Sequence, residues 1–174
     1  LNNNKKVILV FGGSQASSFI NQLIIYNIDY LKNFQIIIIA GKEKQKIENI
    51  LFEKQIRGVV FDFYYNMNEL YSIADIVISR SGGGTIAEIT YWKIPSILIP
   101  YPFAGGHQFL NAKFLQEKGA CFILSQKEEV IYNFPSYFKK FLKNYDKIKN
   151  SLNNLKLYDD GKIVDIILND IREK

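Results

Sequence analysis

The sequence predicts an α/β protein built on a doubly wound parallel sheet. The first observation is an alternation of short, continuous apolar runs with stretches of helical periodicity along most of the 174 residues. Continuous apolar strands are typical of a parallel sheet whose two faces are both covered by helices. The second observation is that glycine-rich or polar turns directly follow four of these runs, which is where ligands bind such sheets.

Each expected element follows from its local pattern. Runs rich in β-branched residues are predicted as strands. They cover residues 7–11, 35–40, 58–63, 76–79, 96–100 and 121–124. Helical spacing of apolar residues predicts helices between the strands, at 17–31, 44–54, 67–73, 84–92 and 108–118. From Glu128 onward the pattern is amphipathic and helical, and a last helix is expected over 162–172.

Length and composition indicate a single domain over residues 1–174, with a helical tail from about 128. A chain of 174 residues can bury a core without disulfides. No run reaches the ~20 apolar residues of a spanning helix, and no signal peptide precedes the first strand, so we expect a soluble domain. The chain begins with Leu1 rather than Met, which indicates that it was cut from a longer protein.

The net charge of +5 is compatible with an anionic ligand, a membrane surface or nucleic acid. The lysines do not form one block, so compositional bias is favoured and no nucleic-acid partner is expected. Lysines between 139 and 149 mostly lie off the apolar stripe of their helix, which indicates a solvated face more than a membrane-binding helix. The single cysteine, Cys121, is interpreted as a buried structural thiol in a reducing compartment.

The most informative segment is SRSGGGTIAE at 79–88, between a strand and a helix. Gly82, Gly83 and Gly84 permit positive φ and close approach of a ligand, while the free N–H groups of the helix face an anion. Thr85 is expected either to cap the helix or to bind a phosphate. Glu88 either complements the helix dipole or accepts ribose hydroxyls at the mouth of a nucleotide crevice.

A second glycine turn follows the first strand, where Gly12, Gly13, Ser14 and Gln15 precede a helix. Because the carboxyl ends of parallel strands meet at one edge of the sheet, both turns are expected to border a single crevice.

Polar and aromatic residues follow two further strands. Tyr64 and Tyr65 come after the third strand, so one of them could stack on a base, and core packing is an equal alternative. His107, the only histidine, has no orienting carboxylate nearby, so a phosphate donor or plain helix-start role is favoured over a general base. Gln108 offers an amide donor and acceptor for sugar hydroxyls, and Asn111 is a hydrogen-bonding support or a surface residue.

Several classes of site are disfavoured because their characteristic motifs are absent. The sequence contains neither the Walker A pattern nor the spaced GxGxxG pattern, and it has no His/Cys metal spacing. This counts against P-loop nucleotide hydrolases, dehydrogenases and zinc enzymes.

These motifs resemble, in order, those of the carboxyl-terminal domain of the MurG family. The resemblance extends colinearly from about residue 7 to residue 124. It is carried by FGGSQ at 11–15, ADIVISRSG at 74–82, TIAEI at 85–89, PSILIP at 95–100, HQ at 107–108 and NA at 111–112.

The resemblance implies an activity and a fold. The family transfers N-acetylglucosamine from UDP-N-acetylglucosamine to lipid I, giving lipid II in peptidoglycan synthesis. It has the GT-B fold, in which two Rossmann-like domains face each other across a cleft and the second domain binds the donor. The implied partners are UDP-N-acetylglucosamine, an amino-terminal acceptor domain of the same parent protein, and lipid I at the cytoplasmic face of the bacterial inner membrane. No cofactor and no metal are implied.

The resemblance also implies roles for single residues. Ser14 would contact the diphosphate, and the main chain at Tyr64 would read the uracil edge. Glu88 would bind the ribose, and His107 and Gln108 would contact the hydroxyls of N-acetylglucosamine. The phosphate and sugar would be held by Gly83, Gly84 and Thr85. Supporting roles would fall to Gly12, Gly13, Gln15, Arg80, Ser81, Gly82 and Asn111, with Arg80 shaping its loop.

The sequence departs from the family pattern at two loops. Ala16 and Ser17 follow Gln15 where the family usually has Gly and Ala, and residues 103–106 lack an aspartate often found before the His-Gln pair. The acceptor domain and its proposed catalytic histidine are absent, so no catalytic residue is assigned. Two alternatives are a separate catalytic subunit like that of the eukaryotic dolichol-linked N-acetylglucosamine transferase, and a non-catalytic nucleotide-sugar-binding module.

Overall fold

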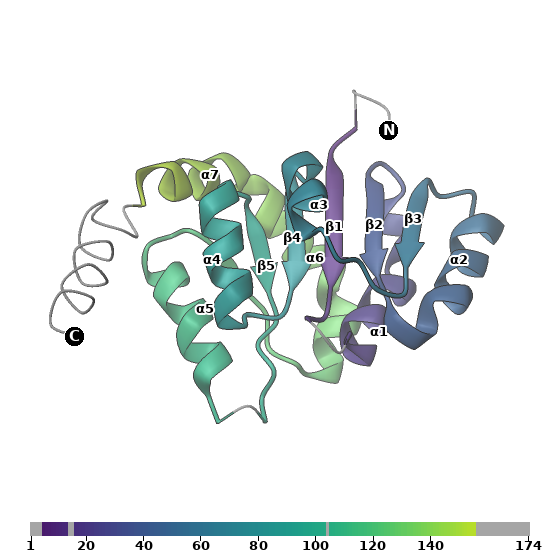
Figure 1. Cartoon of the computed structure of the whole chain (residues 1–174), viewed down its shortest axis with the longest axis horizontal. Helices are drawn as coiled ribbons and strands as arrows, with labels where there is room; N and C mark the ends of the chain where they lie inside the picture. The colour runs from purple at the N-terminus through teal and green to yellow at the C-terminus, as the bar shows by residue number, and fades with distance from the viewer. Residues whose placement is uncertain (1–4, 14–15, 104, 156–174) are drawn as a thin grey trace, which may run out of the picture.

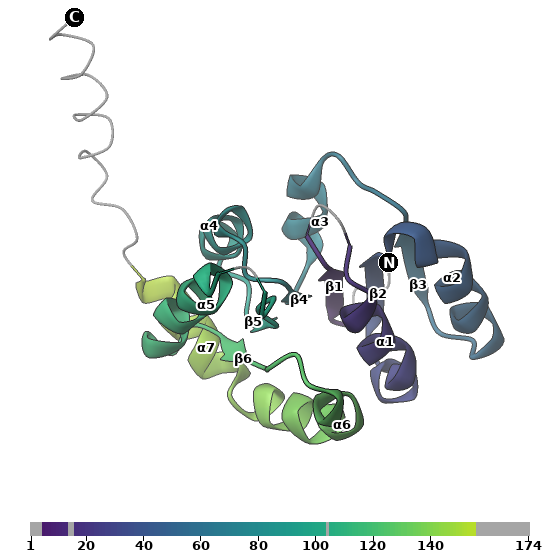
Figure 2. The ribbon, with the colours of Figure 1, turned by 90° about the horizontal axis from the view of Figure 1, so that it is seen from below.

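The computed structural model describes residues 5–13, 16–103 and 105–155, and the helix expected over 162–172 lies outside them. The strands form one parallel sheet in the order β3-β2-β1-β4-β5-β6 (Figure 1, with β6 labelled in Figure 2). The chain crosses from β3 at one edge back to β4 beside β1, which confirms the doubly wound class. The strands are β1 (Val7–Phe11), β2 (Gln35–Ile39), β3 (Gly58–Phe61), β4 (Ile76–Ser79), β5 (Ser96–Leu98) and β6 (Phe122–Ile123).

Helices cover both faces of the sheet. Figure 2 shows α3 and α4 on one face and α1 and α6 on the other. Every residue of β1 and β2 is buried as a result, which explains the continuous apolar runs at 7–11 and 36–39. The α-helices are α1 (Ser18–Tyr26), α2 (Lys44–Glu53), α3 (Met67–Ile73), α4 (Gly83–Trp92), α5 (His107–Glu117), α6 (Glu128–Lys143) and α7 (Tyr145–Asn154). Short 3-10 helices cover Ile28–Leu31 and Gly41–Glu43.

The helix expected over 17–31 divides at Asn27, which is 1% exposed. Its side-chain amide donates to the carbonyl of Leu23 at 2.9 Å and to the carbonyl of Ile131, in α6, at 2.8 Å. The Ile131 carbonyl is open to this bond because Pro135, four residues later in α6, has no N–H to donate to it. Asn27 therefore ends α1 and ties it to α6, while α6 continues through a proline.

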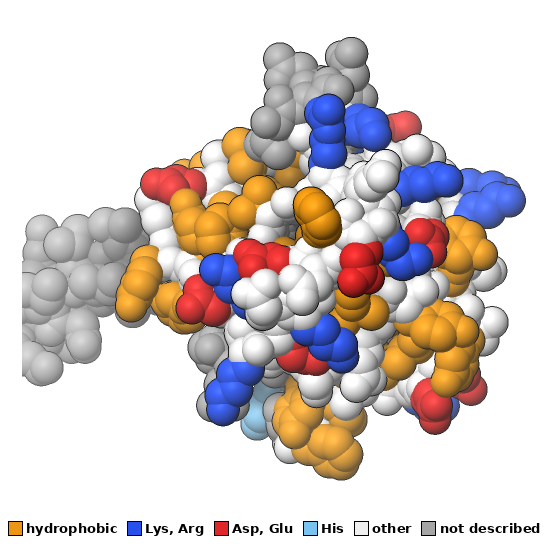
Figure 3. Space-filling view, turned by 90° about the vertical axis from the view of Figure 1, so that its right-hand side faces the viewer, with side chains coloured by type: hydrophobic (Ala, Val, Ile, Leu, Met, Phe, Trp, Pro, Cys, Tyr) orange, Lys and Arg blue, Asp and Glu red, His pale blue; other side chains and the backbone are white. Residues whose placement is uncertain are grey.

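The amphipathic tail from 128 is two helices, which divide at Asn144. Its aromatic stripe faces the core, where Phe134, Phe138 and Phe141 are buried. The lysines of this region are exposed, at 139, 140, 143, 147 and 149. Figure 3 shows that positive and negative side chains are interspersed on the face formed by the α2 and β3 edge. Among the described helices, none combines the length and apolar character needed to cross a membrane.

Cys121 is buried directly before β6, and its thiol lies 3.4 Å from the carbonyl oxygen of Ala112. Burial raises the pKa of the Cys121 thiol to about 12. The thiol is therefore protonated at neutral pH, as a structural role requires.

Candidate functional site

A crevice of about 1180 Å³ opens at the carboxyl ends of the strands. The loops after β1 and β4 border it, so it lies at the point where the strand order reverses. The loops after β2, β3 and β5 also line it. The turns that were singled out in the sequence thus meet around one opening, which is the geometry of ligand sites in open α/β sheets.

The glycine turn after β4 presents unpaired N–H groups to this crevice. Gly82 is the N-cap of α4, and the first N–H bonded within the helix is that of Ile86, which donates to the Gly82 carbonyl at 3.0 Å. Within the described residues, the N–H groups of Gly83, Gly84 and Thr85 have no partner, as expected for a helix start. Such a terminus binds anions through its N–H groups and its positive dipole end.

The reason for the three glycines differs from the prediction. None of Gly82, Gly83 and Gly84 has positive φ, so conformational freedom is not what the turn requires. A Cβ added at any of them would have no neighbouring atom within 4 Å. Gly82 and Gly84 line the crevice. The missing side chains leave room beside the backbone, which allows a ligand to approach the main chain.

Thr85 does not cap α4, because Gly82 holds that position and no side chain caps the helix. Thr85 is the third helical residue, and it lines the crevice. Glu88 also lines the crevice, but it lies in the second turn, beyond the range in which the helix dipole acts strongly. Its Oε2 accepts a hydrogen bond from the Tyr71 hydroxyl at 2.9 Å.

The loop after β1 folds back tightly onto the start of α1. A Cβ on Gly12 would stand 2.2 Å from the Ser17 nitrogen, so only glycine fits there. Ala16 has a φ of +56°, a left-handed conformation that is strained for alanine. Ser17 caps α1 by accepting from the Ile20 N–H at 3.4 Å. Ser14 and Gln15 lie outside the described residues.

Arg80 joins the loops on the two sides of the crevice. Its guanidinium donates to the Ser17 hydroxyl at 2.8 Å and to the Ile99 carbonyl at 2.9 Å. It also lies 5.3 Å from the centre of the Tyr101 ring, in a cation–π contact. Arg80 is only 7% exposed, and no carboxylate among the described residues forms an ion pair with it. Burial lowers its pKa, but an arginine remains charged, so positive charge lies at the wall of the crevice.

The start of α5 is fastened to the loop after β4. Ser81 donates to the Gln108 carbonyl at 2.8 Å, and the Asn111 amide donates to the Ser81 carbonyl at 3.1 Å. The Gln108 side chain accepts from the Tyr101 N–H at 3.0 Å and lines the crevice. His107, the first residue of α5, is exposed and does not line this crevice. The structure therefore brings Gln108 to the opening and leaves His107 outside its lining.

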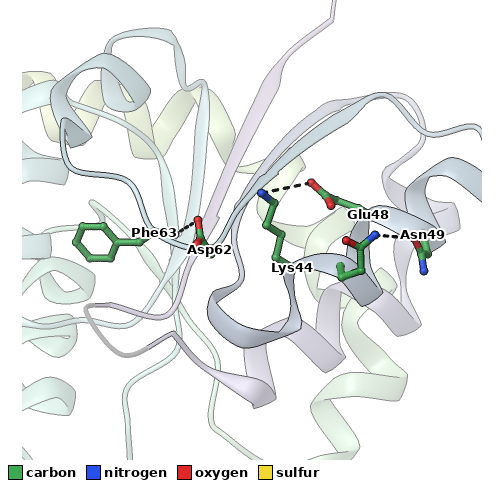
Figure 4. Close-up of polar contacts among 6 residues, drawn as sticks. Lys44, Glu48, Asn49, Asp62 and Phe63 are labelled. Carbon is green, nitrogen blue, oxygen red and sulfur yellow. Dashed lines mark hydrogen bonds and ion pairs between the residues drawn. The ribbon is translucent and has the colours of Figure 1, made fainter.

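The turn after β3 contains a crevice residue to which the sequence pattern gave no role of its own. The ring of Phe63 is 51% exposed and lines the crevice, whereas Tyr64 and Tyr65 do not. Tyr64 packs on Phe61 with ring centres 4.6 Å apart, and its hydroxyl donates to Glu69 at 2.6 Å. Figure 4 shows the Asp62 carboxylate turned back onto the Phe63 N–H, at 2.9 Å, with the Phe63 ring pointing away from α2.

The sequence did not show that the Phe63 ring faces the crevice, because it predicted a strand up to residue 63. The strand ends at Phe61, two residues earlier, and the Asp62 side chain accepts from the Phe63 N–H. The alternation of a strand, which assigns side chains to faces, therefore could not be extended to this residue. The cluster of aromatic residues at a carboxyl end was the available signal. In the described part of the chain, no group of three or more metal-binding side chains occurs.

Comparison with known proteins places this geometry in a family. The model of the glycosyltransferase family 28 C-terminal domain matches residues 7–162. A curated relative from Aquifex aeolicus is 36% identical over 152 residues, covering 86% of this chain and 43% of the relative. A relative from Campylobacter jejuni is 37% identical over 155 residues, covering 86% of this chain and 44% of the relative. Both are named as UDP-N-acetylglucosamine–N-acetylmuramyl-(pentapeptide) pyrophosphoryl-undecaprenol N-acetylglucosamine transferases. The chain spans less than half the length of these two relatives.

Solved structures agree with this assignment. The crystal structure of Acinetobacter baumannii MurG superposes with a TM-score of 0.74 at 25% identity, covering 87% of this chain and 45% of that structure. UDP-GlcNAc 2-epimerase from Neisseria meningitidis, at 15% identity and a TM-score of 0.65, shares the fold. The six-stranded sheet is thus the Rossmann-like half of a GT-B architecture. From its motifs, its fold and the match over residues 7–162, the chain belongs to the glycosyltransferase family 28 C-terminal domains.

Proposed function

We propose that this chain is the donor-binding half of an inverting glycosyltransferase. The complete enzyme transfers N-acetylglucosamine from UDP-N-acetylglucosamine to lipid I and gives lipid II in peptidoglycan synthesis. The observation that carries the proposal is the crevice at the switch point, bordered by the free N-terminus of α4. The names of the relatives from Aquifex aeolicus and Campylobacter jejuni support the choice of donor and acceptor.

The diphosphate of the donor is assigned to the part of the crevice at the start of α4. The free N–H groups at Gly83, Gly84 and Thr85 donate to phosphate oxygens, and the buried Arg80 adds positive charge nearby. Ser14 contributes a further hydroxyl to the diphosphate in this proposal. Because backbone donors already supply the phosphate contacts, we expect binding without a metal ion.

The remaining parts of the donor are assigned to the neighbouring loops. Glu88 accepts the ribose hydroxyls, because its carboxylate faces the crevice from α4. The uracil edge is read by the main chain at Tyr64, in the turn that also places the Phe63 ring in the crevice. His107 and Gln108 contact the hydroxyls of N-acetylglucosamine, and of the two Gln108 lines the crevice.

The chemical step is an attack by the 4-hydroxyl of the acceptor sugar on the anomeric carbon of the donor. The bond from that carbon to the diphosphate breaks, and UDP leaves with the bonding electrons. Preorganised N–H groups at the leaving diphosphate stabilise the charge that develops there. The base that takes the hydroxyl proton is assigned to an amino-terminal acceptor domain, which also binds lipid I at the cytoplasmic face of the membrane.

Titration calorimetry of this chain with UDP-N-acetylglucosamine, with and without a chelator, tests the proposal. We expect weak binding that the chelator does not change, and no comparable binding of GDP-mannose, the control for uracil recognition. Binding that requires magnesium would remove the metal-free mechanism. Equal binding of both nucleotide sugars, or of neither, would overturn the assignment of the donor.

A further inference from the structure

Tyr71 is a buried residue whose polar group points at the candidate site. It lies in α3 and is 1% exposed, and its ring packs edge-on against Phe11 of β1 with centres 6.0 Å apart. Its hydroxyl donates to Oε2 of Glu88, on α4, at 2.9 Å. A buried tyrosine hydroxyl needs a hydrogen-bond partner, and here that partner is a crevice-lining carboxylate.

The direction of this hydrogen bond is fixed. Burial and the bond to Glu88 both raise the pKa of the Tyr71 phenol above its usual range. Tyr71 therefore keeps its proton at physiological pH and remains the donor, and the Glu88 carboxylate can only accept. A carboxylate has two oxygens, so Oε1 of Glu88 is left to accept from a ligand.

The hydrogen bond from Tyr71 also restricts the conformation of the Glu88 side chain. A glutamate on a helix has several rotamers, and holding it in one of them on ligand binding has an entropic cost. Tyr71 removes that cost in advance, because its own ring is fixed by the core between α3, α4 and β1. Glu88 then faces the crevice in a single orientation before the ligand arrives.

From this arrangement we propose that Tyr71 is a positioning residue that holds Glu88 for recognition of the ribose hydroxyls of a uridine nucleotide. The inference rests on the proposed function, since it takes the ribose as the ligand of Glu88. It adds that discrimination in favour of the ribose depends on a residue of α3 that does not line the crevice.

The test compares UDP with 2′,3′-dideoxy-UDP as calorimetric ligands of the wild-type chain and of Tyr71→Phe. Phenylalanine keeps the ring and its packing and removes only the hydroxyl. We expect Tyr71→Phe to weaken UDP about two- to tenfold, the cost of ordering one free side chain, and to leave dideoxy-UDP unchanged. In a Glu88→Ala background, Tyr71→Phe should have no further effect on UDP.

Tyr145→Phe is the matched control. Tyr145 is 8% exposed, and its hydroxyl donates to the Asp75 carbonyl at 3.1 Å, at the opposite end of the sheet from the crevice. Tyr145→Phe also loses a tyrosine hydroxyl, and it should bind both ligands as the wild-type chain does. Both ligands meet the same folded population, so the ratio of their dissociation constants reports on Tyr71 even if Tyr71→Phe is less stable.

The outcomes separate this inference from the proposed function. If Glu88→Ala weakens UDP but Tyr71→Phe does not, the positioning role is overturned and the donor site stands. Equal weakening of UDP and dideoxy-UDP by Tyr71→Phe would show a structural role only. If the wild-type chain binds UDP and dideoxy-UDP equally, the ribose role of Glu88 fails, and the inference fails with it.

Discussion

Glu88 shows why a residue type and its spacing do not settle a role. Its place after a glycine turn was compatible with a dipole partner or a ribose ligand. The structure puts it in the second turn of α4, facing the crevice, with one oxygen bonded to Tyr71. Distance from the helix start weakens the dipole interpretation, and the ribose interpretation stays a proposal.

We expect Glu88→Ala to weaken the binding of UDP by about 1.5–3 kcal/mol, the range for hydrogen bonds to a charged group. This corresponds to roughly a ten- to hundredfold loss of affinity in calorimetry. Glu128→Ala is the control, because Glu128 also accepts from a tyrosine, Tyr132 at 2.9 Å, but lies outside the crevice. Unchanged UDP affinity in a folded Glu88→Ala variant would leave Glu88 only the task of pairing with Tyr71.

Ala16 is an alanine in a left-handed backbone conformation that favours glycine. At a φ of +56° an alanine costs about 1–2 kcal/mol, and glycine does not. Ala16→Gly also gives the unfolded chain about 0.4–1 kcal/mol more conformational entropy, which offsets part of the gain. We therefore expect a net increase of about 0.5 kcal/mol in the free energy of unfolding, measured by urea denaturation.

Ala87→Gly is the control, because it should lower the free energy of unfolding in the same urea assay. Ala87 is exposed in the interior of α4, where glycine should cost about 1 kcal/mol. If Ala16→Gly lowered the stability as much as Ala87→Gly does, the left-handed strain at Ala16 would be contradicted.

At the scale of elements, the sequence predicted the central strands well because β1, β2 and β4 are mostly apolar and fully buried. Element ends were less predictable, because they depend on contacts between distant residues. The end of α1 at Asn27 requires the carbonyl that Pro135 leaves free, more than a hundred positions away. The end of β3 is a local exception, because the Asp62 side chain accepts from the N–H of the next residue, Phe63.

The candidate site shows the same division. The glycine turns could be placed at one edge of the sheet from the pattern of strands alone. That Tyr71 reaches Glu88 depends on how α3 packs against α4, and no local pattern encodes that. Arg80 was expected to shape its loop, and it bonds to Ser17 and to the Ile99 carbonyl.

The N-terminus of α4 leads to a prediction in which stability and binding change in opposite directions. Gly84→Ala places a methyl group where no protein atom lies within 4 Å, so it should stabilise the helix by about 0.5 kcal/mol. The same methyl enters the space beside the free N–H groups and should weaken UDP binding by about 1–3 kcal/mol, as added bulk does in packed contacts.

Thermal unfolding and calorimetry on the same sample measure both effects of Gly84→Ala. Gly119→Ala is the control, because Gly119 has a φ of +68° and lies outside the crevice. It should lower the stability without changing UDP affinity. Unchanged UDP affinity in Gly84→Ala would mean that the ligand does not approach this backbone.

At the scale of the whole molecule, the proposal makes the crevice one wall of a larger site. The chain covers 43% of the relative from Aquifex aeolicus and 45% of the MurG structure from Acinetobacter baumannii. Catalysis by proximity requires the reacting atoms to be aligned within about 3–3.5 Å, and it supplies several kcal/mol of the rate enhancement. In the proposal, the acceptor hydroxyl and its base belong to the other wall.

We therefore expect that the 174 residues alone bind the donor but do not transfer the sugar. The assay mixes labelled UDP-N-acetylglucosamine and a lipid I analogue with this chain, and separately with a full-length family member as the reference. Adding the amino-terminal half of the family member in trans should restore part of the activity, because it returns the acceptor site and the base. Turnover by this chain near the reference rate would contradict the division between two walls. The catalytic group would then lie within these residues, and His107, exposed at the start of α5, would be the first to replace.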